Sequence, residues 1–144
     1  MVASWHEFEI AEPKFAARVR RLLTTRKHLT MATLRRDGSP RISGTEIQFT
    51  DGQLQIGSMT GAVKALDLKR DPRVAIHGPT HDPAKSGSWR GEAKVSGRAT
   101  VVSEEGAHYF RIDLDEVVVT RLGGKGLLIE SWTPAGGLRS RDRA

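Results

Sequence analysis

Hydrophobic and polar residues alternate with a period of two over most of the chain, and this pattern predicts β-strands. Turn signals at Asp37–Pro40 and at Asp51-Gly52 separate the first three alternating runs, so we expect antiparallel hairpins there. The predicted strands are His28–Leu34, Arg41–Phe49, Gln53–Ser58, Arg73–Gly78, Ser88–Val102, Tyr109–Thr120 and Leu127–Trp132.

The second of these runs has two distinct faces, because successive side chains of a strand point to opposite sides. One face would carry Ile42, Gly44, Glu46 and Gln48, and the other Ser43, Thr45, Ile47 and Phe49. The long run Ser88–Val102 contains Gly91 and Gly97, which we expect at the bulges or sharp bends that barrel strands need.

Only two segments have a helical period. Glu12–Arg26 places Phe15, Val19, Leu22 and Leu23 on one face and its arginines on solvated faces, and Ala62–Arg70 ends at Asp71-Pro72. We expect residues 1–11 to be an irregular lead-in and Thr133–Ala144, rich in glycine and arginine, to be a flexible tail.

These elements predict a mainly β protein with one domain over residues 1–144. Six or seven antiparallel strands with short connections and two flanking helices are typical of a closed antiparallel barrel. A chain of 144 residues is long enough to bury a core of this kind without disulfides or metal ions.

The amino-acid composition excludes several classes of function. The chain has no cysteine, which excludes thiol catalysis, cysteine zinc sites and disulfides, and which agrees with a cytoplasmic location. No apolar run approaches the roughly 20 residues of a membrane span, and the first residues do not form a signal peptide, so no membrane association is expected. The net charge of +6 invites polyanions, but the basic residues are scattered and no basic groove with interleaved aromatic residues is visible, so we expect no nucleic-acid partner.

The stretch Leu54–Pro72 carries the most specific chemistry. A strand ends at Gly57-Ser58, a loop of small residues follows, and a helix begins near Lys64. A helix start offers free backbone N–H groups and a positive dipole end, both of which suit a phosphate group. Ser58 and Thr60 add hydroxyl donors and Lys64 adds a cation, so these three residues form the candidate phosphate site.

The run Met31–Ile76 resembles the pyridoxamine 5'-phosphate oxidase-like, FMN-binding split-barrel superfamily. The features that carry the resemblance are ATLRRDGSPR, the strand ending in Gly57-Ser58, Lys64, and LKRDPRVAI, in the expected order and spacing. The strand GEAKVSGRATVV fits the next element of that family. The resemblance implies a split barrel that forms a homodimer, with FMN or the deazaflavin coenzyme F-420 bound at the interface.

The resemblance also implies roles for individual residues. Ser58, Thr60 and Lys64 would hold the phosphate, while the first two strands, around Met31, Thr33, Ser43 and Thr45, would lie beside the ring. The other subunit would cover the ring with Trp89, Arg90 or Trp132. One departure is the absence of a basic residue at Ala62-Val63, where many relatives have one, so Arg41, Arg73 or Arg90 would have to compensate.

The implied activity is a flavin- or deazaflavin-dependent oxidoreductase that transfers hydride between the cofactor and a small organic substrate; oxidation of vitamin B6 is not expected. The alternative is a non-catalytic flavin- or deazaflavin-binding protein of the same fold. Net charge slightly favours the deazaflavin. The sequence indicates no catalytic residue, and solvent, a lysine or Tyr109 remain open as proton donors. His77 and His81 are separated by Gly78-Pro79, so their spacing does not predict a metal site.

Overall fold

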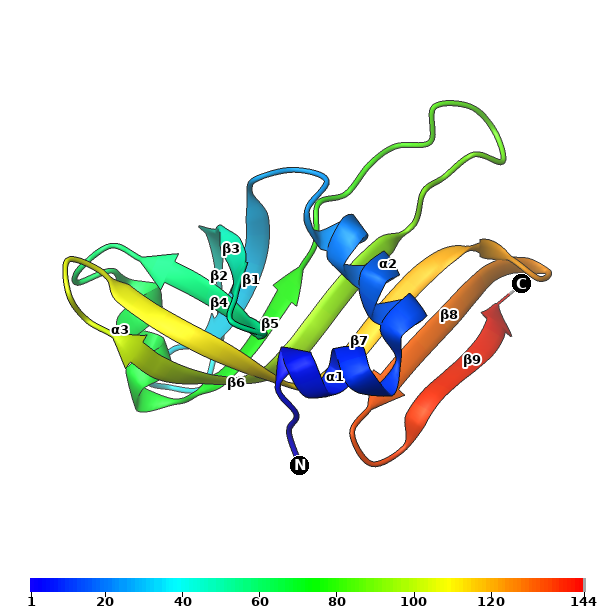
Figure 1. Ribbon diagram of the computed structural model, residues 1–144. Coiled ribbons are helices and arrows are strands. Elements are labelled where there is room, and N and C mark those ends of the chain that lie inside the picture. Colours follow the sequence, from blue (N-terminus) through cyan, green and yellow to red (C-terminus); the bar gives the residue numbers. More distant parts are fainter. Residues whose placement is uncertain (144) are drawn as a thin grey trace.

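A computed structural model describes residues 1–143, over which the chain forms three helices and nine strands in one antiparallel sheet (Figure 1). The mainly β prediction is therefore confirmed, with more strands than the six or seven expected. The helices are α1 (Trp5–Ala11), α2 (Pro13–Leu23) and α3 (Val63–Arg70). The strands are β1 (Leu29–Leu34), β2 (Pro40–Thr45), β3 (Ile47–Thr50), β4 (Gln53–Ser58), β5 (Arg73–His77), β6 (Glu92–Ser103), β7 (His108–Gly123), β8 (Gly126–Thr133) and β9 (Gly137–Arg143).

Seven strands curve into a barrel with a seam. Their hydrogen-bonded order is β2-β1-β5-β6-β7-β4-β3, so the two ends of this path are β2 and β3. These two strands follow one another in the sequence with only Glu46 between them. The barrel is therefore closed at this point by the chain itself and not by a ladder of hydrogen bonds. The predicted single strand Arg41–Phe49 was wrong in this respect, although the assignment of its residues to two faces is confirmed by alternating burial.

The last strands extend the sheet beyond the barrel. The first part of β7 pairs with β4, whereas its second part pairs with β8, and β8 in turn pairs with β9. The prediction of a flexible tail from Thr133 was therefore wrong up to Arg143, because Gly137–Arg143 pairs with Leu127–Thr133 in regular antiparallel register. Ala144, the end of the predicted tail, lies outside the described residues.

Residues 1–11 were also predicted wrongly, because they contain helix α1. Ser4 caps this helix by accepting a hydrogen bond from the Glu7 amide, and the Glu7 carboxylate accepts one from the Ser4 amide. Trp5 and Phe8 are buried in the core, where the Phe8 ring lies 4.7 Å from that of Trp132. Burial of two large aromatic side chains explains why this short helix is stable in the folded protein.

Helix α2 buries the four apolar residues expected of it, against the sheet. Arg20 and Arg21 are exposed, as predicted, whereas Arg18 is half-buried. Arg18 donates a hydrogen bond to Glu130 of β8 at 2.9 Å, and the Arg20 guanidinium lies 4.4 Å from the centroid of the Phe49 ring. Figure 1 shows α1 and α2 together on one side of the sheet and α3 at the far end of the barrel.

The long strand β6 begins at Glu92 and not at Ser88, so Trp89 and Arg90 lie in the loop that follows β5. Its pairing with β7 shifts register between Ser96 and Gly97, which confirms the predicted bulge at Gly97. The longest of the three described helices, α2, has eleven residues, and no described helix has the length and hydrophobicity needed to cross a membrane.

Candidate functional site

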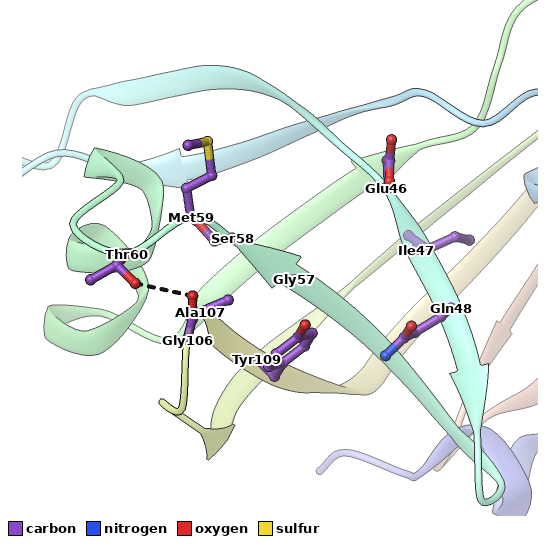
Figure 2. A pocket seen from close by; sticks show the side chains of 10 residues that line it. All are labelled: Glu46, Ile47, Gln48, Gly57, Ser58, Met59, Thr60, Gly106, Ala107 and Tyr109. Atoms are coloured by element: carbon purple, nitrogen blue, oxygen red, sulfur yellow. Dashed lines mark hydrogen bonds between the residues drawn. The ribbon is translucent and has the colours of Figure 1, made fainter.

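The seam of the barrel opens into a cleft made of two adjoining cavities. The larger has a volume of about 570 Å³ and is lined by β3, β4, the start of β7 and the loop before α3 (Figure 2). The smaller, of about 250 Å³, lies toward β2 and α3 and is lined in part by Lys64 and Gly44. The residues that line both cavities are Glu46, Gly57, Ser58 and Met59.

Helix α3 begins at the smaller cavity. No side chain among residues 1–143 caps its N-terminus, so the first backbone N–H groups of the helix are available to a ligand. Lys64, the second residue of the helix, donates a hydrogen bond from Nζ to the Gly44 carbonyl oxygen at 2.6 Å. The cleft thus has a cation and a positive helix end on one wall, an arrangement that attracts an anion.

Ser58 supplies a second feature that points to a ligand. Its side chain is buried, and its hydroxyl oxygen has no hydrogen-bond partner within residues 1–143. A buried hydroxyl without a partner lowers stability unless something satisfies it. Because Ser58 lines both cavities, a polar ligand in the cleft is in a position to do so.

The loop between β4 and α3 is held by the start of β7. The Gly61 amide donates a hydrogen bond to Nε2 of His108 at 3.2 Å, so the neutral imidazole carries its proton on Nδ1. That nitrogen lies 3.5 Å from a carboxylate oxygen of Glu104 without hydrogen-bond geometry. Thr60 donates a hydrogen bond to the Gly106 carbonyl oxygen at 3.4 Å, which Figure 2 shows as a dashed line. These contacts fix the loop that leads into the helix.

A buried carboxylate anchors α3 to the barrel. Asp67 accepts hydrogen bonds from Thr33 at 2.8 Å, from Arg41 at 2.7 Å and from Arg70 at 3.1 Å. Burial alone would raise the pKa of Asp67, but the three hydrogen bonds outweigh it and hold the pKa below its ordinary value. The carboxylate is therefore charged at neutral pH, and it sets the position of the helix relative to β1 and β2.

The larger cavity has a polar wall. Tyr109 lies beside Gly57 on the neighbouring strand, and a Cβ atom at Gly57 would come within 3.0 Å of the tyrosine ring. Gln48 and Tyr109 both line this cavity, from β3 and β7 (Figure 2). A glycine at position 57 therefore keeps the space beside the ring open.

Comparison with models of protein families identifies the family of this chain. A family model described as pyridoxamine 5'-phosphate oxidase matches residues 15–119, which is most of the chain. The chain belongs to the pyridoxamine 5'-phosphate oxidase family. A comparison with curated proteins gave no match.

Several solved structures have a fold similar to that of this chain. A pyridoxamine 5'-phosphate oxidase-related, FMN-binding protein from Nostoc punctiforme PCC 73102 has a TM-score of 0.65 and 12% identity, over 92% of this chain and 96% of that one. PhzG from Burkholderia lata 383, in complex with tetrahydrophenazine-1-carboxylic acid, has a TM-score of 0.65 and 11% identity, over 94% and 90%. A heme-binding protein from Mycobacterium smegmatis has a TM-score of 0.58 and 17% identity, over 86% and 56%. The predicted split barrel is thereby confirmed.

Within this member of the pyridoxamine 5'-phosphate oxidase family, the structure brings together only part of the predicted site. Of the predicted cofactor-binding residues, those that line the cleft are Ser58, Thr60, Lys64 and Thr45. Ser43 lies half-buried on the inner face of β2 and lines neither cavity. Thr33 is buried, and its hydroxyl donates a hydrogen bond to Asp67 instead of facing the cleft.

Three residues were expected to cover the ring from the other subunit. Trp132 is buried in the core against Phe8, so that prediction was wrong for it, and Trp89 and Arg90 lie away from the cleft in the chain's own fold. Trp89 and Arg90 belong to the loop between β5 and β6, where the Trp89 indole N–H donates a hydrogen bond to the His81 carbonyl oxygen at 2.9 Å. Arg41 and Arg73 do not replace the missing basic residue, because Arg41 pairs with Asp67 and Arg73 with Asp71. The covering of the ring by Trp89 or Arg90 of a second subunit stays a prediction.

Sequence reasoning missed one residue that lines the cleft and two that position its walls. Glu46 was assigned to a continuous strand, yet it lies at the seam and lines both cavities. His108 and Asp67 were not singled out, although they position the loop and the helix. The only sequence signal for Asp67 is a charged residue on the apolar face of a helix. Among residues 1–143, no three histidine or acidic side chains lie close enough together to hold a metal ion.

Proposed function

We propose that this protein binds FMN or the deazaflavin coenzyme F-420 by its phosphate group in the cleft at the barrel seam, and uses it to transfer hydride to or from a small organic substrate. The observation that carries the proposal is the buried, unpartnered hydroxyl of Ser58 beside Lys64 and the uncapped start of α3. A hydroxyl donor, a cation and free amides are the groups that bind phosphate in proteins. The FMN-binding protein from Nostoc punctiforme, which shares the fold, supports the choice of cofactor.

The residues present fit a phosphate ester. Lys64 would supply the charge, Ser58 and Thr60 hydroxyl donors, and the first amides of α3 the remaining hydrogen bonds. When bound, either cofactor supplies hydride transfer at its ring. Tyr109 and Gln48 line the larger cavity, where they would orient a small substrate by hydrogen bonds. Glu46 lies 3.6 Å from Lys27, a contact that partly balances its charge, and 3.7 Å from Nδ1 of His28.

FMN and F-420 both carry a phosphate, so the phosphate site fits either cofactor. The net charge of +6 favours the more acidic deazaflavin. The loss of a basic residue at Ala62-Val63 weakens the hold on the doubly charged phosphate of FMN. Both features lean toward F-420, with FMN as the close competitor.

A homodimer forms part of the proposal. Three large apolar side chains around the cleft are exposed: Ile42 by 76%, Met59 by 82% and Val63 by 52%. Ile42 shares the outer face of β2 with Gly44, which receives the Lys64 hydrogen bond. Exposed apolar residues gathered at one site indicate a surface that another molecule covers. Light scattering coupled to size exclusion is expected to give twice the mass of the chain, and Ile42→Lys is expected to give the monomer.

Titration of the purified protein tests the cofactor. Fluorescence is followed on addition of FMN, F-420, riboflavin and heme, where riboflavin serves as the matched control because it lacks the phosphate. We expect saturable binding of FMN or F-420 and much weaker binding of riboflavin. Equal affinity for riboflavin and FMN would mean that the phosphate does not contribute to binding. Tighter binding of heme than of FMN or F-420 would mean that the cofactor is heme and not a flavin or deazaflavin.

A non-catalytic carrier is the second candidate function. The observation in its favour is that Arg41 and Arg73 are occupied by Asp67 and Asp71, so Lys64 is the cation of the phosphate site. Stopped-flow mixing of the reduced, bound cofactor with quinone, nitro and enone acceptors separates the two candidates. Reoxidation faster than that of the free cofactor supports an enzyme, and reoxidation at the same rate or slower supports a carrier.

A further inference from the structure

Strand β9 ends the sheet with one open edge. It pairs with β8 on one side, and no described strand pairs with it on the other, as Figure 1 shows at the rim of the sheet. An edge strand exposes a row of backbone N–H and C=O groups that can pair with another strand. This edge is independent of the cleft at the barrel seam.

A row of arginines lies along this strand. Arg139, Arg141 and Arg143 alternate with Leu138, Ser140 and Asp142, so the three guanidinium groups lie on one face. All three are exposed, and none forms an ion pair with another residue of the described chain, although eight other basic residues do. Side chains on one face of a strand repeat about every 7 Å, which is also the spacing of alternate residues in a second strand.

The arginines form one wall of a groove of about 800 Å³ on the outer face of β6 to β9. Its floor combines the apolar side chains of Val118, Leu127 and Ile129 with the hydroxyls of Thr120 and Ser131, and Trp89 also lines the groove. The carboxylates of this face, Glu92 and Glu116, come from β6 and β7 on the opposite side of the floor. The rim formed by β9 is therefore positive, and the negative groups lie two or three strands away.

The charge of the strand decides between possible occupants. If two copies paired antiparallel along β9, their arginine rows would lie side by side on the same face and would repel one another. Arginines on an edge thus oppose association of the chain with itself and favour an acidic strand. A single-stranded nucleic acid would need aromatic side chains for its bases along the groove, and this groove has only Trp89.

We propose that β9 is a docking strand for an extended acidic peptide segment of a partner protein. The segment would add to the sheet as its next strand through backbone hydrogen bonds, and would carry a carboxylate at every second residue, opposite Arg139, Arg141 and Arg143. Strand addition of this kind takes its affinity from the backbone and its specificity from alternate side chains.

The test uses a capped, fluorescein-labelled peptide of four Val-Glu repeats and the full chain. Fluorescence anisotropy is expected to show binding that weakens as salt is added, since the contacts are ionic. A peptide of the same composition with four valines followed by four glutamates is expected to bind at least about tenfold more weakly, because its carboxylates lose their register with the arginines. A Val-Glu peptide with N-methylated amides is expected to lose binding, because it cannot pair with the strand edge.

Variants link the binding to the strand. Arg139→Gln combined with Arg141→Gln is expected to weaken binding by about tenfold, whereas Arg36→Gln, which removes an exposed charge in the turn after β1, is expected to leave it unchanged. The double variant Arg139→Glu with Arg141→Glu is expected to bind a labelled peptide of four Val-Lys repeats in place of the Val-Glu peptide. Should the variants fail to fold, hydrogen exchange in the unaltered protein provides a second readout, since the peptide is expected to protect amides of β9.

Several results would overturn the proposal. They are the absence of binding at millimolar peptide, equal binding of the alternating and the block peptide, undiminished binding of the N-methylated peptide, and protection of amides elsewhere than β9. Tighter binding of an eight-residue oligothymidylate would assign the arginine row to nucleic acid and would equally contradict the proposal.

Discussion

Lys64 reaches across the seam of the barrel, with its Nζ 2.6 Å from the carbonyl oxygen of Gly44, so the start of α3 is tied to β2. The contact holds the lysine at the cleft even before a ligand enters. A neutral carbonyl is a weaker partner for an ammonium group than a phosphate. The lysine is therefore positioned in advance and can exchange this bond for a stronger one.

Lys64→Ala is accordingly expected to weaken FMN or F-420 binding by about 10- to 100-fold, the value of one hydrogen bond to a charged group. Fluorescence titration measures the effect. Riboflavin affinity should not change, and Lys85→Ala, in the exposed loop after β5, serves as the control for loss of one positive charge. If Lys64→Ala binds FMN and F-420 as tightly as the unaltered protein, α3 is not the phosphate anchor.

Ser58→Ala should move stability and affinity in opposite directions. Removing a buried hydroxyl that has no partner costs the free protein nothing, so its free energy of unfolding should stay constant or rise by up to about 1 kcal/mol. The same change should weaken cofactor binding, because a donor to the phosphate is lost. Urea unfolding without cofactor and titration with cofactor measure the two effects. A clear loss of stability in the free protein would show that the hydroxyl already has a partner.

Gly97→Ala tests the bulge between β6 and β7, where Asp115 is the extra residue of β7 opposite Ser96 and Gly97. A Cβ atom at this position would lie 1.8 Å from the Asp113 carbonyl oxygen of β7, so backbone must move to admit it. We expect a loss of at least about 2 kcal/mol in the free energy of unfolding, as for other overpacked sites. Gly44→Ala is the matched control, since its nearest neighbour would be at 4.0 Å. Equal stability of the two variants would contradict the role of the bulge.

The sequence predicted well what local alternation decides. The approximate positions of most strands, the two faces of β2 and β3, and the bulge at Gly97 depend on residues close in the chain, and these predictions are confirmed. The seam was missed because Glu46 fits the alternation of its neighbours on both sides. Only the strand order of the whole sheet shows that the chain turns there from one end of the path to the other.

Elements stabilised by distant partners could not be predicted in the same way. Helix α1 has only seven residues, too few for a stable helix in isolation, and depends on aromatic packing with Trp132 and Phe49. Strand β9 has the composition of a tail, and its order comes from pairing with β8. Thr33 has the same hydroxyl as Thr45, yet it faces Asp67, 34 residues away in the sequence, and not the cleft.

The Asp67 cluster makes a prediction about stability. Asp67→Asn keeps the shape of the side chain but removes the charge that Arg41 and Arg70 face. We expect a loss of about 2–3 kcal/mol in the free energy of unfolding at pH 7, the range for hydrogen bonds to a charged group. Urea unfolding measures it. Asp71→Asn is the control, because its pairing with Arg73 is at the surface and should contribute much less.

The stability difference between the unaltered protein and Asp67→Asn should also depend on pH. The sign of this dependence follows from the pKa of Asp67. Because this pKa is lower in the folded chain than in the unfolded one, the carboxylate stabilises the fold above the unfolded value near 3.8, and the contribution is lost as the pH falls through the folded value. The stability difference between the unaltered protein and Asp67→Asn should therefore be constant from pH 7 to about pH 5 and shrink below pH 4. The other acidic groups titrate alike in both proteins and cancel. A difference that stays constant to pH 2.5 would mean that the anchoring of α3 does not depend on the charge of Asp67.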